Sequence, residues 1–122
     1  MQAKIHFPDP ATEFLTEERC HILESWNSPD DSSVSIAKIR VEPGVSTANH
    51  VLDKIHERYV ILSGEGSVVI GDLPPAKVVA GDVVIIPANT PQRISNTGDT
   101  DLIFYAICTP RFEQSCYRKL DN

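Results

Sequence analysis

Three polar residues, His50, Glu57 and Gln92, stand among valine, isoleucine and leucine at or just beyond the ends of expected strands. A polar group buried there without a partner costs about 1 to 3 kcal/mol, so each of them needs something to bind. A divalent metal would satisfy all three, through an imidazole nitrogen, a carboxylate oxygen and an amide oxygen, and would keep coordination positions open for substrate. These residues predict a site for manganese, iron or zinc.

The same three residues also allow a pocket without a metal. In that alternative, His50 and Glu57 hydrogen-bond one another and Gln92 donates to Glu57. Glu57 and Tyr59 are the candidate catalytic residues, because they lie two positions apart and so share one face of a strand. The Tyr59 hydroxyl would orient a substrate or donate a proton. Its alternative role is that of a wall aromatic residue with one satisfied hydroxyl.

Two motifs contain these residues. The first, residues 44–66, begins with a Pro-Gly pair and carries His50 and Glu57 before a Gly-Glu-Gly turn. The second, residues 81–96, begins with Gly-Asp and carries Gln92 after a Pro-Ala-Asn-Thr-Pro turn. Glycine and proline at these positions supply tight turns and end strands, so they specify a fold rather than a reaction.

The spacing of both motifs resembles that of the cupin superfamily, whose patterns are G-x5-H-x-H-x4-E-x6-G and G-x5-P-x-G-x2-H-x3-N. Leu52 stands where the family has its second histidine, and Gln92 stands where it has its third. The resemblance covers roughly residues 33–110 and implies that His50 and Glu57 occupy metal-ligand positions. Cupins include dioxygenases, isomerases, decarboxylases, lyases and storage proteins, so the resemblance does not select a reaction.

His56 is another source of an imidazole, provided that residues 53–55 bulge and turn it inward. Alternation along a strand argues against this. With Glu57 and Tyr59 facing inward, His56 and its neighbour Arg58 face outward. We therefore expect an exposed His56.

Short runs rich in valine and isoleucine, separated by nine prolines and six glycines, predict an all-β chain. Strands about ten residues apart suit a sandwich or barrel, and the resemblance implies a jelly-roll barrel, or double-stranded β-helix. A short helical turn is expected within residues 12–19, with Thr16 as its N-cap. The expected strands are residues 19–26, 33–41, 57–62, 67–71, 77–80, 83–87, 92–96 and 102–108.

The expected organisation is one domain in three parts. Residues 1–32 form an N-terminal segment whose strand packs on the barrel or on a partner subunit, residues 33–110 form the barrel, and residues 111–122 form a C-terminal tail. The runs at residues 83–86 and 102–107 are apolar on both faces, so a second layer or a partner must cover their outer side. We expect a homodimer, which the resemblance also implies.

The amino-acid composition of the chain limits the classes of partner that it can bind. With 11 Lys and Arg residues against 17 Asp and Glu residues, the net charge of -6 leaves no basic stripe for nucleic acid. No apolar run reaches the length of a membrane span, and Pro8 interrupts the start of the chain before a signal-peptide core. Three cysteines without a C-x-x-C pair suit a reducing compartment. We expect a cytoplasmic protein with a small-molecule ligand, no nucleic acid and no membrane.

These observations lead to two candidate functions. The first is a metal-dependent enzyme, of isomerase, decarboxylase, lyase or dioxygenase type, acting on a carbonyl- or carboxylate-bearing metabolite. The alternative is a metal-free small-molecule-binding module without catalytic activity, which Leu52 and Gln92 favour because they replace two strong ligands.

Overall fold

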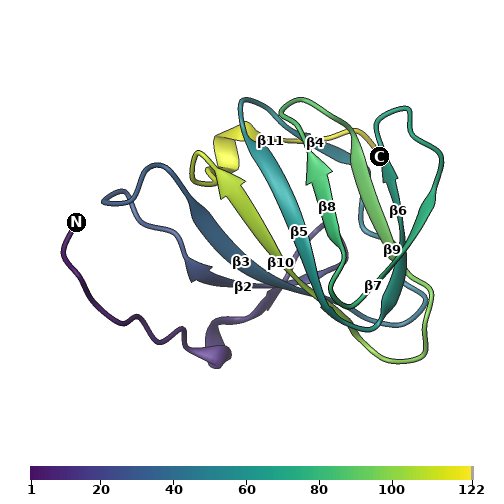
Figure 1. Cartoon of the computed structure of the whole chain (residues 1–122), viewed down its shortest axis with the longest axis horizontal. Helices are drawn as coiled ribbons and strands as arrows, with labels where there is room; N and C mark the ends of the chain where they lie inside the picture. Colours follow the sequence, from purple (N-terminus) through teal and green to yellow (C-terminus); the bar gives the residue numbers. More distant parts are fainter. Residues whose placement is uncertain (122) are drawn as a thin grey trace.

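The computed structural model describes residues 1–121, and two antiparallel sheets form the two sides of its barrel (Figure 1). One sheet has the order β1-β2-β3-β10-β5-β8, and the other has the order β11-β4-β9-β6-β7. The expected all-β class is confirmed. The strands are β1 (Phe14–Leu15), β2 (His21–Trp26), β3 (Ser35–Val41), β4 (His50–Leu52), β5 (His56–Ser63), β6 (Glu65–Ile70), β7 (Ala76–Val79), β8 (Val83–Ile86), β9 (Gln92–Asn96), β10 (Leu102–Thr109) and β11 (Tyr117–Lys119).

The core lies between the two sheets and is built by alternation along the strands. In β10, buried residues alternate with half-buried ones along the whole strand. Phe104 is 1% exposed and lies opposite Ile39 of β3 and Ile61 of β5. In β5, Glu57 and Tyr59 are buried with Ile61, which confirms the expected inward face.

Two turns of the motifs require unusual backbone angles. Gly64 has φ +84, and a Cβ there would lie 2.6 Å from the Asp101 carbonyl oxygen, so only glycine fits without strain. Asn89 has φ 64, a left-handed conformation that asparagine adopts more readily than most residues.

The outer face of the larger sheet is partly covered by the chain itself. The ring of Trp26 contacts the ring of His6 at 5.4 Å between centroids, and Lys4 Nζ lies 4.8 Å from the Trp26 ring centroid. A surface groove between the N-terminal segment and this sheet is lined by Tyr105 and Ile107 of β10. The run at residues 102–107, which is apolar on both faces, is therefore partly covered by residues of its own chain.

Three short elements differ from the expected pattern. The helical turn expected within residues 12–19 is wrong: β1 lies there, and a turn follows it in which Arg19 has φ 71. A 3-10 helix, η1 (Pro10–Thr12), precedes β1, and a second, η2 (Gln114–Cys116), precedes β11. Within residues 1–121, no helix is long and apolar enough to span a membrane.

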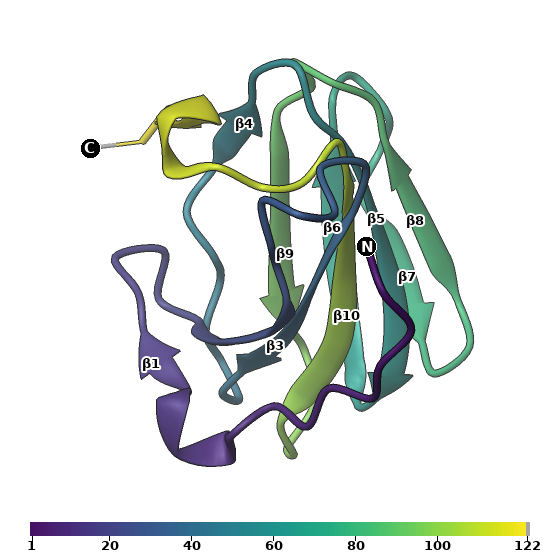
Figure 2. The same ribbon diagram turned by 90° about the vertical axis from the view of Figure 1, so that its left-hand side faces the viewer.

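Both end segments dock on the strand that carries His50. In Figure 2, the purple β1 and the yellow C-terminal segment lie on the left, and β7 and β8 lie on the right. The Ala48 amide donates to the Glu18 carbonyl oxygen at 3.1 Å, and the Leu120 amide donates to the Asn49 carbonyl oxygen at 2.8 Å. β11 also pairs with β4 along its length. The position of His50 therefore depends on both ends of the described chain.

Candidate functional site

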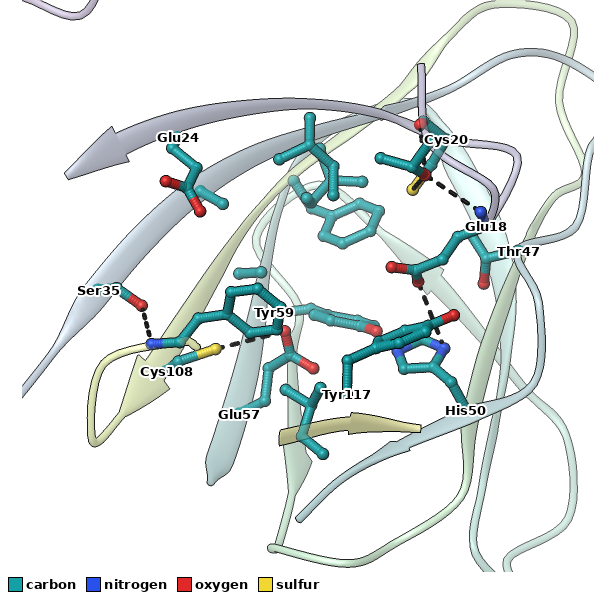
Figure 3. Close-up of a pocket in the computed structure, with 18 of the residues that line it drawn as sticks. Glu18, Cys20, Glu24, Ser35, Thr47, His50, Glu57, Tyr59, Cys108 and Tyr117 are labelled. Carbon is teal, nitrogen blue, oxygen red and sulfur yellow. Dashed lines mark hydrogen bonds and ion pairs between the residues drawn. The ribbon is translucent and has the colours of Figure 1, made fainter. Parts of the chain in front are cut away.

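A cavity of about 490 Å³ lies inside the barrel and contains His50, Glu57 and Tyr59 in its wall. Figure 3 shows these side chains pointing toward a common space, together with Glu18 and Tyr117. The volume falls in the range of pockets that hold small organic molecules. The structure thus brings together three of the four predicted site residues around one space.

Glu57 is the most deeply buried charged residue of the site. It begins the inward face of β5, opposite Cys108 of β10, and is 8% exposed. Its Oε2 accepts a weak hydrogen bond from the Cys108 thiol at 3.6 Å, whereas its Oε1 is buried without a hydrogen-bond partner. Burial raises the pKa of this carboxyl group to about 7, against the opposing effects of His50 and the Gln92 amide.

His50 lies on β4 with its ring held on one side. Its Nδ1 is 2.7 Å from the Ala48 carbonyl oxygen and 3.4 Å from a carboxylate oxygen of Glu18. Because a carbonyl oxygen only accepts, Nδ1 carries a proton, and Nε2 is the acceptor nitrogen of the neutral ring. The Tyr117 ring packs against the imidazole at 5.2 Å between centroids.

Glu18 is a member of the site that the sequence analysis missed. It lies in the turn after β1, and its side chain is 19% exposed. This turn is fixed on the segment before His50, since Arg19 Nε donates to the Ser46 carbonyl oxygen at 2.9 Å. Burial raises the pKa of Glu18, while His50 and Lys119 lower it. The only signal in the sequence was the acidic pair of Glu17 and Glu18, which the expected helical turn explained equally well.

Tyr59 and Gln92 form a pair in the barrel wall. The Tyr59 hydroxyl donates to the Gln92 amide oxygen, and the Tyr59 ring packs on Phe104 at 4.5 Å between centroids. Burial raises the pKa of Tyr59 well above its usual value. Gln92 is 1% exposed and is not part of the cavity wall, although its Cα lies opposite that of His50 in the β4–β9 pair.

Other polar side chains lie away from the cavity, as expected. His56 is exposed, and its Nδ1 accepts from the Ala88 amide at 3.0 Å. Arg40 pairs with Glu13 at 2.7 Å and with Asp101 at 3.4 Å. Neither His56 nor Arg40 is part of the cavity wall.

The hydrogen bonds predicted for a metal-free pocket differ from the observed ones. His50 contacts Ala48 and Glu18, and the Gln92 oxygen accepts from Tyr59. Against the effect of burial, His50 and the Gln92 amide both lower the pKa of Glu57, but Glu57 Oε1 has no hydrogen-bond partner.

A resident divalent metal does not fit these residues. In the described part of the chain, no group of three or more His, Cys, Asp or Glu side chains is arranged to hold a metal ion. The Gln92 oxygen is engaged by Tyr59, and Leu52 offers no donor atom. Of the predicted ligands, His50 and Glu57 remain, and although Glu18 lies next to His50, these three side chains are not arranged to hold a metal ion.

Comparison with known proteins identifies the class. The family model described as "Cupin domain" matches residues 37–108, which is more than half of the chain. The chain belongs to the cupin family, and its two sheets are the jelly-roll barrel that the motifs predicted.

Particular relatives share the word oxalate in their names. A curated Thermotoga maritima protein named "Oxalate-binding protein" is 33% identical over 90 residues, which cover 74% of this chain and 73% of that one. The crystal structure of a predicted oxalate decarboxylase from Thermotoga maritima has a TM-score of 0.67 and 28% identity, covering 75% of this chain and 80% of that one. Oxalate decarboxylase of Lactobacillus farciminis, in a formate complex, has a TM-score of 0.77 but 22% identity, covering 89% of this chain and 33% of that one, so it shows the fold alone.

Proposed function

We propose that this cupin domain binds a small organic molecule in its barrel cavity without a resident metal ion. The observation that carries the proposal is Glu57, a residue of the cavity wall whose Oε1 is buried without a partner. A buried acceptor of this kind is costly unless a donor reaches it, and a ligand in the cavity supplies that donor. The names of the two Thermotoga relatives support small-molecule binding.

The other polar groups define what such a ligand meets. His50 Nε2 is an acceptor when the ring is neutral, because the Nδ1 proton is directed to Ala48. Tyr117 Oη is a second buried polar atom without a partner, at the side where its ring packs on His50. The ligand proposed here therefore carries hydrogen-bond donors for the Glu57 carboxyl group and the His50 ring.

Proton transfer to or from the bound molecule is a second candidate function. It is favoured by the pKa of Glu57, because a carboxyl group with a pKa of about 7 exchanges its proton near neutral pH. Tyr59 then has a supporting role, since its proton is directed to Gln92 and its ring forms part of the wall.

Elemental analysis tests the absence of a metal. Protein purified without chelator or nickel resin is analysed by inductively coupled plasma mass spectrometry, before and after incubation with manganese, iron(II) and zinc. We expect far less than one metal ion per chain in every sample. A value close to one per chain would overturn the proposal and restore the predicted site at His50, Glu57 and Gln92.

We also propose that the chain forms a homodimer and acts in the cytoplasm. Support for the dimer comes from β8, the edge strand of the larger sheet, where Val83 is 55% exposed and Ile85 is 62% exposed. Exposed apolar side chains on an edge strand are suited to pairing with a second copy. Size-exclusion chromatography with light scattering tests this, and the mass of a single chain at high concentration would rule it out.

A further inference from the structure

The charges around the cavity are almost all of one sign. Among the described residues that form its wall, there is no lysine or arginine, and His50 is the only side chain there that can become a cation. Four carboxyl groups line the same space, those of Glu17, Glu18, Glu24 and Glu57. Even a protonated His50 offsets at most one of them, so the field in the cavity disfavours an anionic ligand.

Two of these carboxyl groups are placed to act on a ligand. Glu57 is 8% exposed and its Oε1 has no partner, and the Glu18 side chain is 19% exposed and turned inward (Figure 3). Burial is the largest cause of the raised pKa of each, and it outweighs the opposing effect of His50 on both groups and of Lys119 on Glu18. An ammonium group in the cavity would supply the missing positive charge and the missing hydrogen-bond donor together.

The rest of the cavity wall is suited to contact the apolar part of a ligand. Isoleucine, leucine and alanine side chains line it together with five aromatic rings, from Phe14, Tyr59, Phe104, Phe112 and Tyr117. Aromatic faces next to carboxylates are the usual surroundings of organic ammonium ions, because the ring quadrupole attracts a cation. A dianion as small as oxalate would contact these rings without any cation to meet.

We infer that the ligand of this cavity is a small organic amine with an apolar body, bound through its ammonium group to Glu57 and Glu18. The inference rests on the proposed function, since it names the class of molecule that the metal-free cavity binds. The four carboxyl groups of the wall, without a lysine or arginine among its described residues, disfavour a dianion such as oxalate in this cavity.

Three probes of similar shape and different charge test the inference: phenethylamine, phenethyl alcohol and hydrocinnamate. Oxalate is a fourth probe, and all are titrated into the metal-free full chain by isothermal titration calorimetry at neutral pH. We expect the amine to bind at least about tenfold more tightly than the alcohol, because charge-assisted hydrogen bonds are about twice as strong as neutral ones. Hydrocinnamate and oxalate should bind more weakly than the alcohol.

Two variants test which carboxyl groups bind the ammonium group. Glu57→Gln and Glu18→Gln should each weaken amine binding about fivefold or more, and leave alcohol binding nearly unchanged, because each removes a charge and keeps the shape. Asp72→Asn is the matched control, since Asp72 is an exposed carboxylate in the turn after β6. It should change neither affinity.

The outcomes separate this inference from the proposed function. Hydrocinnamate, oxalate or the alcohol binding as tightly as the amine would overturn the amine assignment and leave metal-free binding in place. Equal loss of amine and alcohol affinity in both variants would also overturn it. If none of the four probes binds, the assignment is wrong, and the metal analysis described above then decides the proposed function separately.

Discussion

Replacing Glu57 by glutamine should change the pH dependence of stability in a defined direction. The pKa of Glu57 is raised from 4.5 to about 7 in the folded protein, so the folded state holds a proton that the unfolded state has released. Its contribution to stability is therefore fully present below about pH 4.5 and is lost as the pH rises through about 7. Glutamine keeps the shape but does not titrate.

The size of the effect follows from the same shift. A rise in pKa from 4.5 to about 7 corresponds to about 3 kcal/mol over the whole range, because one pH unit is worth about 1.4 kcal/mol. Between about pH 5 and about pH 8, the folded wild-type protein should lose about 2 to 3 kcal/mol relative to Glu57→Gln. No reduction for solvent screening is needed, since Glu57 is 8% exposed.

Urea denaturation of both proteins at these two pH values, without ligand, measures the difference. The burial of Glu18 also raises a pKa and adds to the pH dependence of the wild type, but the comparison with Glu57→Gln isolates Glu57. Asp72→Asn serves as the control and should follow the wild type. If the wild type and Glu57→Gln change in parallel between the two pH values, Glu57 is ionised in the folded protein, and the account of an uncompensated carboxyl group is wrong.

Three other substitutions test the packing that positions the site, each by the free energy of unfolding in urea. Tyr59→Phe leaves the buried oxygen of Gln92 without its donor and should cost about 1 to 3 kcal/mol; no loss would mean that Gln92 finds another partner. Phe104→Ala should cost about 3 to 5 kcal/mol, because the ring is 1% exposed at the centre of the core, and a cost below about 1 kcal/mol would contradict that burial. Gly64→Ala should cost more than about 1 kcal/mol, since φ is +84 and the new methyl group would meet the Asp101 carbonyl oxygen, and a neutral result would refute the strain assigned to this turn.

The long strands could be predicted from sequence because their signal is local. Alternation of apolar residues and the turn residues between them placed β9 at both of its ends, and placed β3, β5 and β10 within two residues. The short strands β1, β4 and β11 have two or three residues each, which is too few for a period to be recognised. They form because partners distant in the sequence pair with them.

The residues of the site that share one strand or belong to one motif could be predicted from the sequence. Glu57 and Tyr59 face inward because alternation along β5 requires it, and His50 follows from the spacing of the first motif. Glu18 reaches the cavity only because a turn far away in the chain is held against the segment before His50. The bond between Tyr59 and Gln92 joins two strands of different sheets, and a single sequence carries no local signal for such a contact.

Leu52 connects the cavity to the packing of the C-terminal segment. It is 3% exposed and packs in a small hydrophobic cluster that joins the barrel to the C-terminal segment, with Ile55, Cys108, Phe112, Cys116 and Tyr117. A histidine at this position would add a ligand and, in the same step, put a polar ring into the contacts that hold β11 on β4. The side chain at this one position therefore links the chemistry of the cavity to the attachment of the C-terminal segment.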